Sequence, residues 1–594
     1  MRRSLTPLSF TFSLLLLPVL ASASLIGCGI QTSTPDSHGA VGSAGSANGT
    51  GEGGGSNGVS GASSGGGSVA QAGASTSPYL PARIRRLTNA EYENSVHAVV
   101  GNSDPVTGSF SPDTRQGGYT VNDAQRVDSV LIKQIASAAS TLAAQVRTQV
   151  DSFAPCADQT TQAETCAKAF IQSFAGKAYR RPLGADEAQK LLDLYHVAAD
   201  DGGTYTDGIE QVASGVLQSA AFLYLTEVGD GTATTSPLNL TPYETASELS
   251  YLVTGGPPNA DLLSAAAAGQ LATPEQRGAM FSRLYSSADP AGSHARVVRV
   301  INEWLGTDRL VDTAKDTTVY GGFAGLKLAM VSESADFVQH LLDTKSGTVG
   351  ELLSASWTAT KDQGLIQLYK GSSAGQADGE ISLPERRGML NQAAFLAVYA
   401  HASETGPVLR GVAVERRLAC ITVPSPAQLM ITVPPLTPDP TKTMRDRLGG
   451  HVTDPQCAAC HTSIDSFGFT FELYDGMGQL QTTDHGHPVN SATTIKVGKD
   501  FDGDYPDSNA LATALSNSAA VRECFARNAF RAAAGRSDDD VAASEDAFVA
   551  YWKTLPAPAP DATHSQPASA VQGNILETMR AYITSPTFTQ RRAQ

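Results

Sequence analysis

The chain has 594 residues, with 42 Lys and Arg against 58 Asp and Glu, which gives a formal net charge of −16 at pH 7. This acidic balance argues against a nucleic-acid partner, because neutralising phosphates requires clustered basic residues. Beyond the N-terminus no run of 18 or more apolar residues occurs, so we expect the mature body not to span a membrane. No glycine loop for a nucleotide and no nucleophile-elbow motif occurs either, so we expect no nucleotide partner.

The N-terminus has the pattern of an export signal. Two arginines precede an apolar core over residues 10–20, which is typical of a secretory signal peptide. Residues 25–28, Leu-Ile-Gly-Cys, resemble the bacterial lipobox, whose cysteine receives a diacylglycerol. We therefore predict a signal peptide over 1–27 and a lipid anchor at Cys28 that binds the membrane of the bacterial cell envelope. The location that follows is the outer membrane, facing the periplasm or the cell surface; the alternative is an ordinary signal peptide with an unrelated cysteine.

A low-complexity segment follows the lipobox. Residues 39–76 contain 14 Gly, 8 Ser and 7 Ala in 38 positions. Such a composition cannot bury enough apolar surface to fold and behaves as a flexible linker. We therefore predict that 28–78 is a tether and that function lies beyond it.

Helical signals dominate the rest of the chain, while period-two runs are scarce. Thr88 and Glu91 form a predicted capping box. Thr241 and Glu244 form a second one, with Pro242 at the first helical position. The predicted fold class is mostly α, with helical modules in series over 79–155, 156–230, 231–380, 381–495 and 496–594. Further helices are expected over 164–174, 186–196, 207–225, 275–286, 298–305, 324–342, 384–400, 411–418 and 518–534. Residues 424–440 hold six prolines, which predicts an extended crossing inside the module 381–495.

One motif predicts specific chemistry. Cys457, Cys460 and His461 form C-x-x-C-H, the attachment motif of c-type haem. Two thiols three residues apart can add to the two vinyl groups of one porphyrin, and the adjacent histidine then ligates the iron. We therefore predict one covalent haem c, with His461 as its proximal ligand. The alternatives are a disulfide or a chance pair of cysteines followed by a surface histidine, and a thioredoxin-like redox pair.

The other cysteines fit an oxidising compartment. Export favours disulfides, and four cysteines remain once the lipid and haem positions are assigned. Cys156 and Cys166 are ten residues apart across a polar loop, which predicts one bridge. Cys420 and Cys524 are the remaining pair, and would tie the Pro-rich crossing to the last module.

The sixth iron ligand is open from sequence alone. Met477, 16 residues after His461, is the candidate, because a methionine raises the potential and suits electron transfer. The other nearby candidates are His451, His485, His487 and Met444. An empty position would instead permit peroxide or oxygen chemistry.

Several segments together resemble one family: large exported proteins of myxobacteria and planctomycetes built from planctomycete-specific domains of unknown function, often with a cytochrome c motif. The segments that match in order are Arg-Leu-Thr-Asn-Ala-Glu-Tyr at 86–92, Phe170 through Ala-Tyr-Arg-Arg-Pro-Leu at 178–183, 240–251, Arg-Arg-Gly-Met-Leu at 386–390 with 407–411, and 522–536. The resemblance covers nearly everything after residue 80.

The resemblance implies haem attachment at Cys457, Cys460 and His461. The downstream pattern of the family, D-x-x-G…E…D-x-x-G, is matched by Asp465, Gly468, Glu472, Asp475 and Gly478, whereas Ile464 and Ser466 stand where relatives usually have Met and Pro. Many relatives carry an additional N-terminal cytochrome domain. Here the tether occupies that region, so we expect one haem at most.

These observations predict a lipid-anchored surface or periplasmic protein with one c-type haem. It would act in electron transfer, with a redox partner protein, or as the redox part of an extracellular oxidative process. One rival is a non-enzymatic surface lipoprotein that is stabilised by disulfides and binds a polymer such as a polysaccharide. Another is a haem-dependent peroxidase or oxygenase, so whether the protein is an enzyme is left open.

Overall fold

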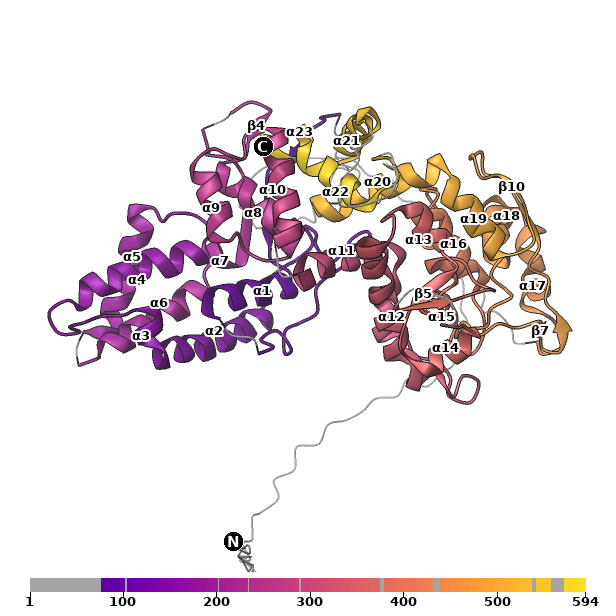
Figure 1. Ribbon diagram of the computed structural model, residues 1–594, viewed down its shortest axis with the longest axis horizontal. Coiled ribbons are helices and arrows are strands. Elements are labelled where there is room, and N and C mark those ends of the chain that lie inside the picture. Colours follow the sequence, from indigo (N-terminus) through magenta and orange to yellow (C-terminus); the bar gives the residue numbers. More distant parts are fainter. Residues whose placement is uncertain are drawn as a thin grey trace, which may run out of the picture. The chain divides into compact units, whose positions relative to one another are not determined.

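The computed structural model describes residues 76–593 apart from 102–103, 201, 233, 288–289, 374–378, 431–438, 537–540 and 557–570 (Figure 1). The predicted signal peptide, the predicted lipidation at Cys28 and the tether up to residue 75 lie outside the described residues. So does the middle of the Pro-rich crossing. None of the helices in the described ranges combines the length and the apolar character that a membrane span needs.

The predicted fold class is confirmed, because helices make up most of the regular structure and the strands pair only in small sheets. The first part of the chain, coloured indigo to magenta in Figure 1, is a group of helices. Its elements are β1 (Leu80–Pro81), β2 (Arg83–Arg86), α1 (Asn89–Val100), α2 (Leu131–Thr148), α3 (Val150–Phe153), α4 (Ala163–Ala178), α5 (Ala185–Ala199), α6 (Tyr205–Leu217), α7 (Ala220–Leu223) and β3 (Tyr224–Glu227).

The middle of the chain continues with helices and two paired strands. Its elements are β4 (Leu238–Asn239), α8 (Pro242–Thr254), α9 (Ala260–Ala267), α10 (Pro274–Ser287), α11 (Pro290–Leu305), η1 (Thr307–Asp312), α12 (Phe323–Thr344), α13 (Val349–Ser354), β5 (Trp357–Ala359), α14 (Gln363–Tyr369) and β6 (Glu380–Ser382).

The last part contains the C-x-x-C-H segment and the C-terminal helices. Its elements are η2 (Met389–Asn391), α15 (Ala393–Val398), α16 (Pro407–Arg417), α17 (Met444–Arg447), η3 (Leu448–Val452), α18 (Pro455–Phe469), β7 (Thr483–Asp484), β8 (His487–Pro488), β9 (Thr493–Ile495), β10 (Gly503–Tyr505), α19 (Ser508–Asn517), α20 (Ala519–Ala534), α21 (Ala542–Thr554), α22 (Ile575–Thr584), α23 (Pro586–Thr589) and β11 (Gln590–Arg592).

Both predicted capping boxes are present. The Glu91 amide donates to the Thr88 hydroxyl, and the Thr88 amide donates to the Glu91 carboxylate at 2.9 Å. Thr241 and Glu244 make the same reciprocal pair at the start of α8, whose first residue is Pro242. These bonds satisfy backbone donors that the first turn of a helix leaves free.

Two predicted helices are shorter than expected. The helix predicted over 207–225 ends at Leu217, and β3 then pairs antiparallel with β2. The helix predicted over 384–400 is reduced to η2 and α15, because Gly388 has φ +58° and lies against the backbone of Leu353. A Cβ at Gly388 would be 2.1 Å from the Leu353 carbonyl oxygen, so this close approach requires glycine there.

The five predicted modules share two principal hydrophobic cores. The modules 79–155 and 156–230 surround one core, which runs from Leu87 to Leu225 and receives Tyr251 from α8. The three later modules contribute to the other, to which Leu249, Trp304 and Phe395 belong together with Phe467 of α18 and Phe530 of α20. The predicted boundaries near 380 and 495 therefore do not separate these cores.

The two ends of the described chain meet at a buried group of charges. β11 lies between β1 and β4 in one small sheet. Glu227 of β3 is fully buried and accepts from Arg83 and Arg591, the latter at 2.6 Å, while Arg536 lies 3.6 Å away. We call Arg83, Glu227, Arg536 and Arg591 the arginine junction. It joins the first and last parts of the chain.

Both predicted disulfides are present. Cys156 bridges to Cys166 in α4, and Cys420, just after α16, bridges to Cys524 in α20. The second bridge closes a separation of 104 residues. It ties the end of α16 to the helix whose last carbonyls accept hydrogen bonds from Arg83 of the arginine junction.

Candidate functional site

The C-x-x-C-H motif lies on a helix. Asp454 caps α18 by accepting a hydrogen bond from the Gln456 amide at 2.8 Å, and Pro455 occupies the first helical position. Both features favour a helix start. Cys457, Cys460 and His461 therefore follow one another along the first two turns, in the part of the chain labelled α18 in Figure 1.

Glycines hold α18 close to α16. A Cβ on Gly411 would be 2.0 Å from the carbonyl oxygen of Ile464, and one on Gly468 would be 1.9 Å from that of Pro407. Only glycine permits two helix backbones to approach so closely. Ile464 and Phe467 are buried on the same helix, so the motif is fixed to the core by the second half of α18.

The two motif thiols differ from the other described cysteines. Cys457 and Cys460 are free and half-buried, whereas Cys156, Cys166, Cys420 and Cys524 form disulfides. Cys457 and Cys460 are not bonded to each other, which leaves the chance pair of cysteines as the form of the structural alternative that matches this geometry. The two thiols are therefore available for covalent chemistry.

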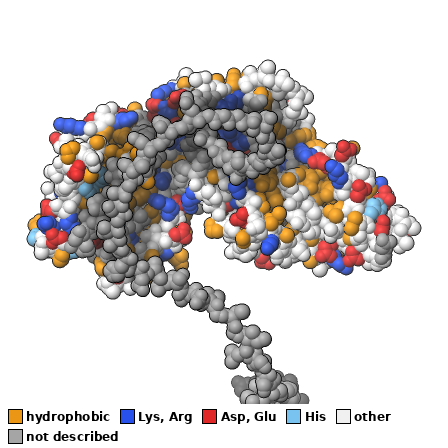
Figure 2. Space-filling view, turned by 180° about the vertical axis from the view of Figure 1, so that it is seen from behind, with side chains coloured by type: hydrophobic (Ala, Val, Ile, Leu, Met, Phe, Trp, Pro, Cys, Tyr) orange, Lys and Arg blue, Asp and Glu red, His pale blue; other side chains and the backbone are white. Residues whose placement is uncertain are grey.

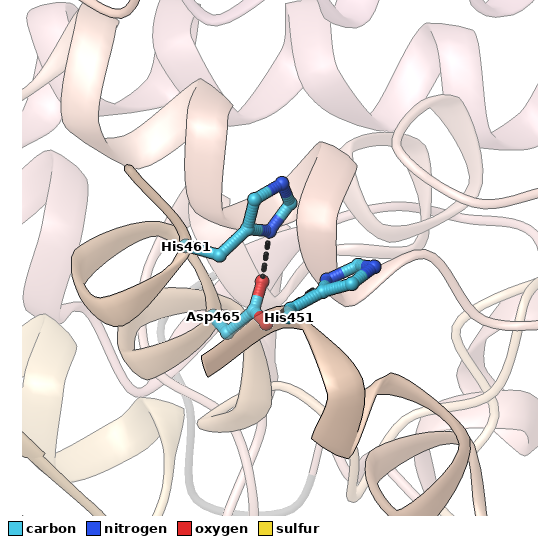
Figure 3. A group of neighbouring side chains, drawn as sticks. All are labelled: His451, His461 and Asp465. Carbon is cyan, nitrogen blue, oxygen red and sulfur yellow. Dashed lines mark hydrogen bonds and ion pairs between the residues drawn. The ribbon is translucent and has the colours of Figure 1, made fainter. Parts of the chain in front are cut away.

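A buried carboxylate lies between two histidines. His461 Nδ1 is 2.9 Å from Asp465 Oδ1, and His451 Nδ1 of η3 is 3.2 Å from Asp465 Oδ2 (Figure 3). The centroids of the two imidazole rings are 4.1 Å apart. The Asp465 side chain is only 3% exposed, while the two histidines are about one quarter exposed, at 23% for His461 and 29% for His451. We call Cys457, Cys460, His461, Asp465 and His451 the thiol–histidine site.

The three polar residues of this site can also be considered as metal ligands. One donor atom from each of His451, His461 and Asp465 lies within 4.8 Å of the others. Two imidazoles and a carboxylate suit transition metals. Because each Nδ1 already faces the carboxylate, each Nε2 is the nitrogen left for a metal, and neither Nε2 makes a hydrogen bond within the described ranges.

A second carboxyl group lies beside the site on α16. Glu415 is buried, and its Oε1 makes no hydrogen bond with the described residues. Burial raises the pKa of this carboxyl, the Ser463 hydroxyl opposes the rise, and the Asp465 charge adds to it. The site therefore contains two carboxyl groups, Asp465 and Glu415, and burial favours the neutral form of Glu415.

The structure separates the sixth-ligand candidates. Met477 packs in a hydrophobic cluster with Tyr320 and Phe323, distinct from the two cores, and Met444 packs in another with Phe469. His485 and His487 belong to the exposed β7–β8 turn. Among these candidates and His451, only His451 has a ring in contact with His461. Ligation by Met477 stays a prediction.

The residues downstream of the motif form a buried support. Arg410 of α16 donates to four backbone carbonyls, those of Leu396, Phe471, Tyr474 and Asp475. Glu472 is buried beside it, accepts from Thr405 at 2.9 Å, and lies 3.7 Å from Arg410. Burial raises the pKa of Glu472 to about 7, against the opposing charge of Arg410. Asp475 accepts from the Met477 and Gln479 amides and shapes the following turn.

This donor set fits a covalently bound porphyrin. Two free thiols three residues apart precede a histidine whose Nε2 is free of hydrogen bonds within the described ranges, and whose Nδ1 is held by a carboxylate. All three side chains are partly exposed, so a planar group can reach them without entry into the core. The C-x-x-C-H spacing indicates the two thiols and His461, whereas Asp465 is matched only by the downstream pattern of the family, which does not place it beside His461.

Four family models match successive parts of the chain, and each is described as a protein of unknown function. They are DUF1587 (PSD3) over residues 85–148, DUF1595 (PSD5) over 166–227, DUF1592 (PSD4) over 240–370 and DUF1588 (PSCyt3) over 386–484. Each range falls inside one predicted module. The thiol–histidine site lies within the last range.

Neither the curated proteins nor the solved structures include a significant match to this chain. The similarity of this chain to known proteins therefore rests on the four family models. The chain is similar to these four families in the order PSD3, PSD5, PSD4 and PSCyt3, which is its domain architecture from residue 85 to residue 484.

Proposed function

We propose that the protein is an exported lipoprotein that carries one c-type haem, attached through Cys457 and Cys460 and ligated by His461. It transfers electrons or provides the redox part of an extracellular oxidative process. The observation that carries this proposal is the contrast among the cysteines, since only the two motif thiols remain free among the described residues. The PSCyt3 match over 386–484 adds support.

The haem would supply one-electron redox chemistry or oxygen chemistry. The residues of the chain would do the rest: the thiols attach it, His461 binds through Nε2, and Asp465 orients His461. Charged side chains of both signs are interspersed on the face in Figure 2, against an acidic net charge of −16. A basic redox partner suits that net charge, although the charge alone does not select one.

The test is haem content in a host with cytochrome c maturation machinery. The full chain is exported and purified, and an alkaline pyridine haemochrome spectrum gives the haem type and its ratio to protein. We expect a c-type α-band at about one haem per chain. The C457A/C460A double variant should lose covalent haem staining on a denaturing gel. A C156A/C166A double variant is the control, because it removes two cysteines and leaves the motif intact.

The outcomes of this test distinguish the proposal from its alternatives. Absence of haem in the wild-type chain under these conditions would refute the proposal and favour the structural lipoprotein. Staining that survives the C457A/C460A change would refute the attachment residues. Anchoring is tested separately, since Cys28→Ala should move the protein from the membrane fraction to the soluble exported fraction and leave haem content unchanged.

One observation favours the haem-enzyme alternative. Met477 is packed with Tyr320 and Phe323, where the Asp475 carboxylate also fixes its backbone amide. If Met477 stays there, it would not serve as an iron ligand, and a bound haem would be able to take an external ligand. Shifts of the haem absorption bands on adding cyanide or imidazole would support this alternative, and an unchanged spectrum would argue for an internal sixth ligand.

A further inference from the structure

The carboxylate of Asp465 is placed to act on the histidine that binds the iron. It lies four residues after His461 on α18, so the two side chains share a helix face. Its two oxygens face two nitrogens, Nδ1 of His461 at 2.9 Å and Nδ1 of His451 at 3.2 Å. A carboxylate has no hydrogen to donate, so each bond requires the proton on Nδ1 of the neutral imidazole. Each Nε2 then presents its lone pair.

We propose that Asp465 is the positioning residue of the iron ligand His461. We further propose that His451 weakens the effect of Asp465 on His461, because it shares the same carboxylate. The inference rests on the proposed function and adds two residue roles to it. A carboxylate that accepts from a ligating imidazole fixes the tautomer and makes the imidazole a stronger donor. A stronger donor stabilises the oxidised iron and lowers the reduction potential.

The geometry argues against His451 as the sixth iron ligand. Two axial ligands of one iron lie on opposite faces of the porphyrin. Here both imidazoles bond to one carboxylate, and their ring centroids are 4.1 Å apart, which is van der Waals contact. No porphyrin fits between rings in contact. In this arrangement His451 acts on Asp465 and not on the iron.

The two roles give shifts of opposite sign in the midpoint potential. Asp465→Asn replaces a charged acceptor by a neutral one, so the potential should rise. His451→Ala removes the competing donor and leaves the whole carboxylate to His461, so the potential should fall. His451→Gln keeps an N–H donor at the same place and should restore most of the wild-type value.

The matched control is Asp446→Asn on α17. Asp446 is exposed and its carboxylate accepts from Thr443, so this variant removes one negative charge without touching either imidazole. Potentials are measured by spectroelectrochemical titration of the full-length holoprotein at fixed pH and ionic strength. The proposal is overturned if Asp465→Asn shifts the potential no more than Asp446→Asn does, or if His451→Ala raises it.

A second measurement needs no haem and leaves Asp465 intact. In the C457A/C460A protein, nitrogen-15 NMR of the imidazoles at pH 8 should show both His451 and His461 as the Nδ1–H tautomer. The Nε2–H tautomer at His461 would contradict the proposal. Because this protein carries no haem, the tautomers test the role of Asp465 even if the wild-type chain proves to be haem-free, a result that would contradict only the proposed function.

Discussion

Two carboxylates in this protein are each shared between several donors, and they differ in what the donors are. Glu227 of the arginine junction is fully buried and is surrounded by Arg83, Arg536 and Arg591. Asp465 of the thiol–histidine site is buried too, but its partners are two imidazoles about one quarter exposed. Arginine is always charged and has no acceptor, whereas a neutral imidazole keeps one nitrogen free for a metal.

The difference separates a structural site from a candidate functional one. At Glu227 the arginines also donate hydrogen bonds to backbone carbonyls. Arg83 donates to those of Ala534 and Gly535. Arg591 donates to those of Thr587 and Phe588. At Asp465 each imidazole leaves Nε2 free of hydrogen bonds to described residues. The first arrangement holds segments together, and the second presents a ligand.

The largest effect is expected from removing the charge at the junction. Glu227→Gln leaves three arginines without their central counter-charge, and breaking a buried pair in this way costs about 3–5 kcal/mol. We expect that loss in the free energy of unfolding, measured by urea denaturation. Glu164→Gln, which removes an exposed i,i+4 partner of Lys168, is the control and should change stability little. Equal effects of the two variants would mean that Glu227 is not a structural centre.

The sequence predicts these two sites to very different degrees. Cys457, Cys460 and His461 are adjacent in the chain, so their spacing alone indicates their chemistry. Asp465 could have been found, since Asp454 followed by Pro455 signals a helix start and places Asp465 one turn after His461. Glu227 could not, because its partner Arg591 lies 364 positions away and nothing local specifies the pairing.

The helices show the same limit. α4 and α5 have large apolar residues at helical spacing and were predicted within a few residues of their ends. No helix is predicted for α2, because its N-cap is Val130, which makes no side-chain capping hydrogen bond, so the sequence lacks a start signal there. The disulfide pairs followed from counting cysteines. The sharing of cores among modules depends on long-range packing that no local pattern carries.

The second prediction concerns the disulfide between the helix that packs on the thiol–histidine site and the helix that contacts the arginine junction. Cys420–Cys524 joins the end of α16 to α20, across 104 residues, while Cys156–Cys166 spans ten. Loop-closure entropy gives about 4.7 kcal/mol for a 100-residue loop and about 2.7 kcal/mol for a ten-residue one. We therefore expect C420A/C524A to lower the free energy of unfolding by about 2 kcal/mol more than C156A/C166A. An equal or reversed order would show that native-state packing outweighs chain entropy here.

The third prediction uses pH, because the two regions contain carboxyl groups shifted in opposite directions. Arg591, Arg83 and Arg536 outweigh burial and hold the pKa of Glu227 well below its usual range. Its stabilisation is present above pH 4.5 and is lost as the pH falls. Burial raises the pKa of Glu472 to about 7, so the folded state binds this proton more tightly than the unfolded state does. The stability from Glu472 is present below pH 4.5 and is lost as the pH rises to about 7.

Glu472→Gln isolates the second contribution, because glutamine resembles the protonated acid. The difference in unfolding free energy between the variant and the wild type should move in favour of the variant by about 3 kcal/mol between pH 4.5 and pH 8. Burial also raises the pKa of Glu333 to about 7, and Glu333 remains in both proteins, so it cancels in this difference. A difference that does not vary with pH would place the pKa of Glu472 near its ordinary value.

The smallest effect is expected from the contact that fixes the thiol–histidine site to the core. In Gly411→Ala the added Cβ would lie 2.0 Å from the Ile464 carbonyl oxygen, so α16 and α18 must separate. Overpacking of this kind costs about 1–3 kcal/mol. Gly325→Ala in α12 is the control, since it is also a helical glycine and a Cβ there meets nothing within 4 Å. That variant should gain about 0.5–1 kcal/mol from helix propensity.

Because Asp465 directly follows Ile464, separation of α16 and α18 in Gly411→Ala should also disturb the bonds of Asp465 to His451 and His461. This disturbance should be visible as a loss of the Nδ1–H tautomers in NMR of the C457A/C460A protein. If stability falls but the tautomers persist, α18 carries the site as a rigid unit and its positioning does not depend on α16.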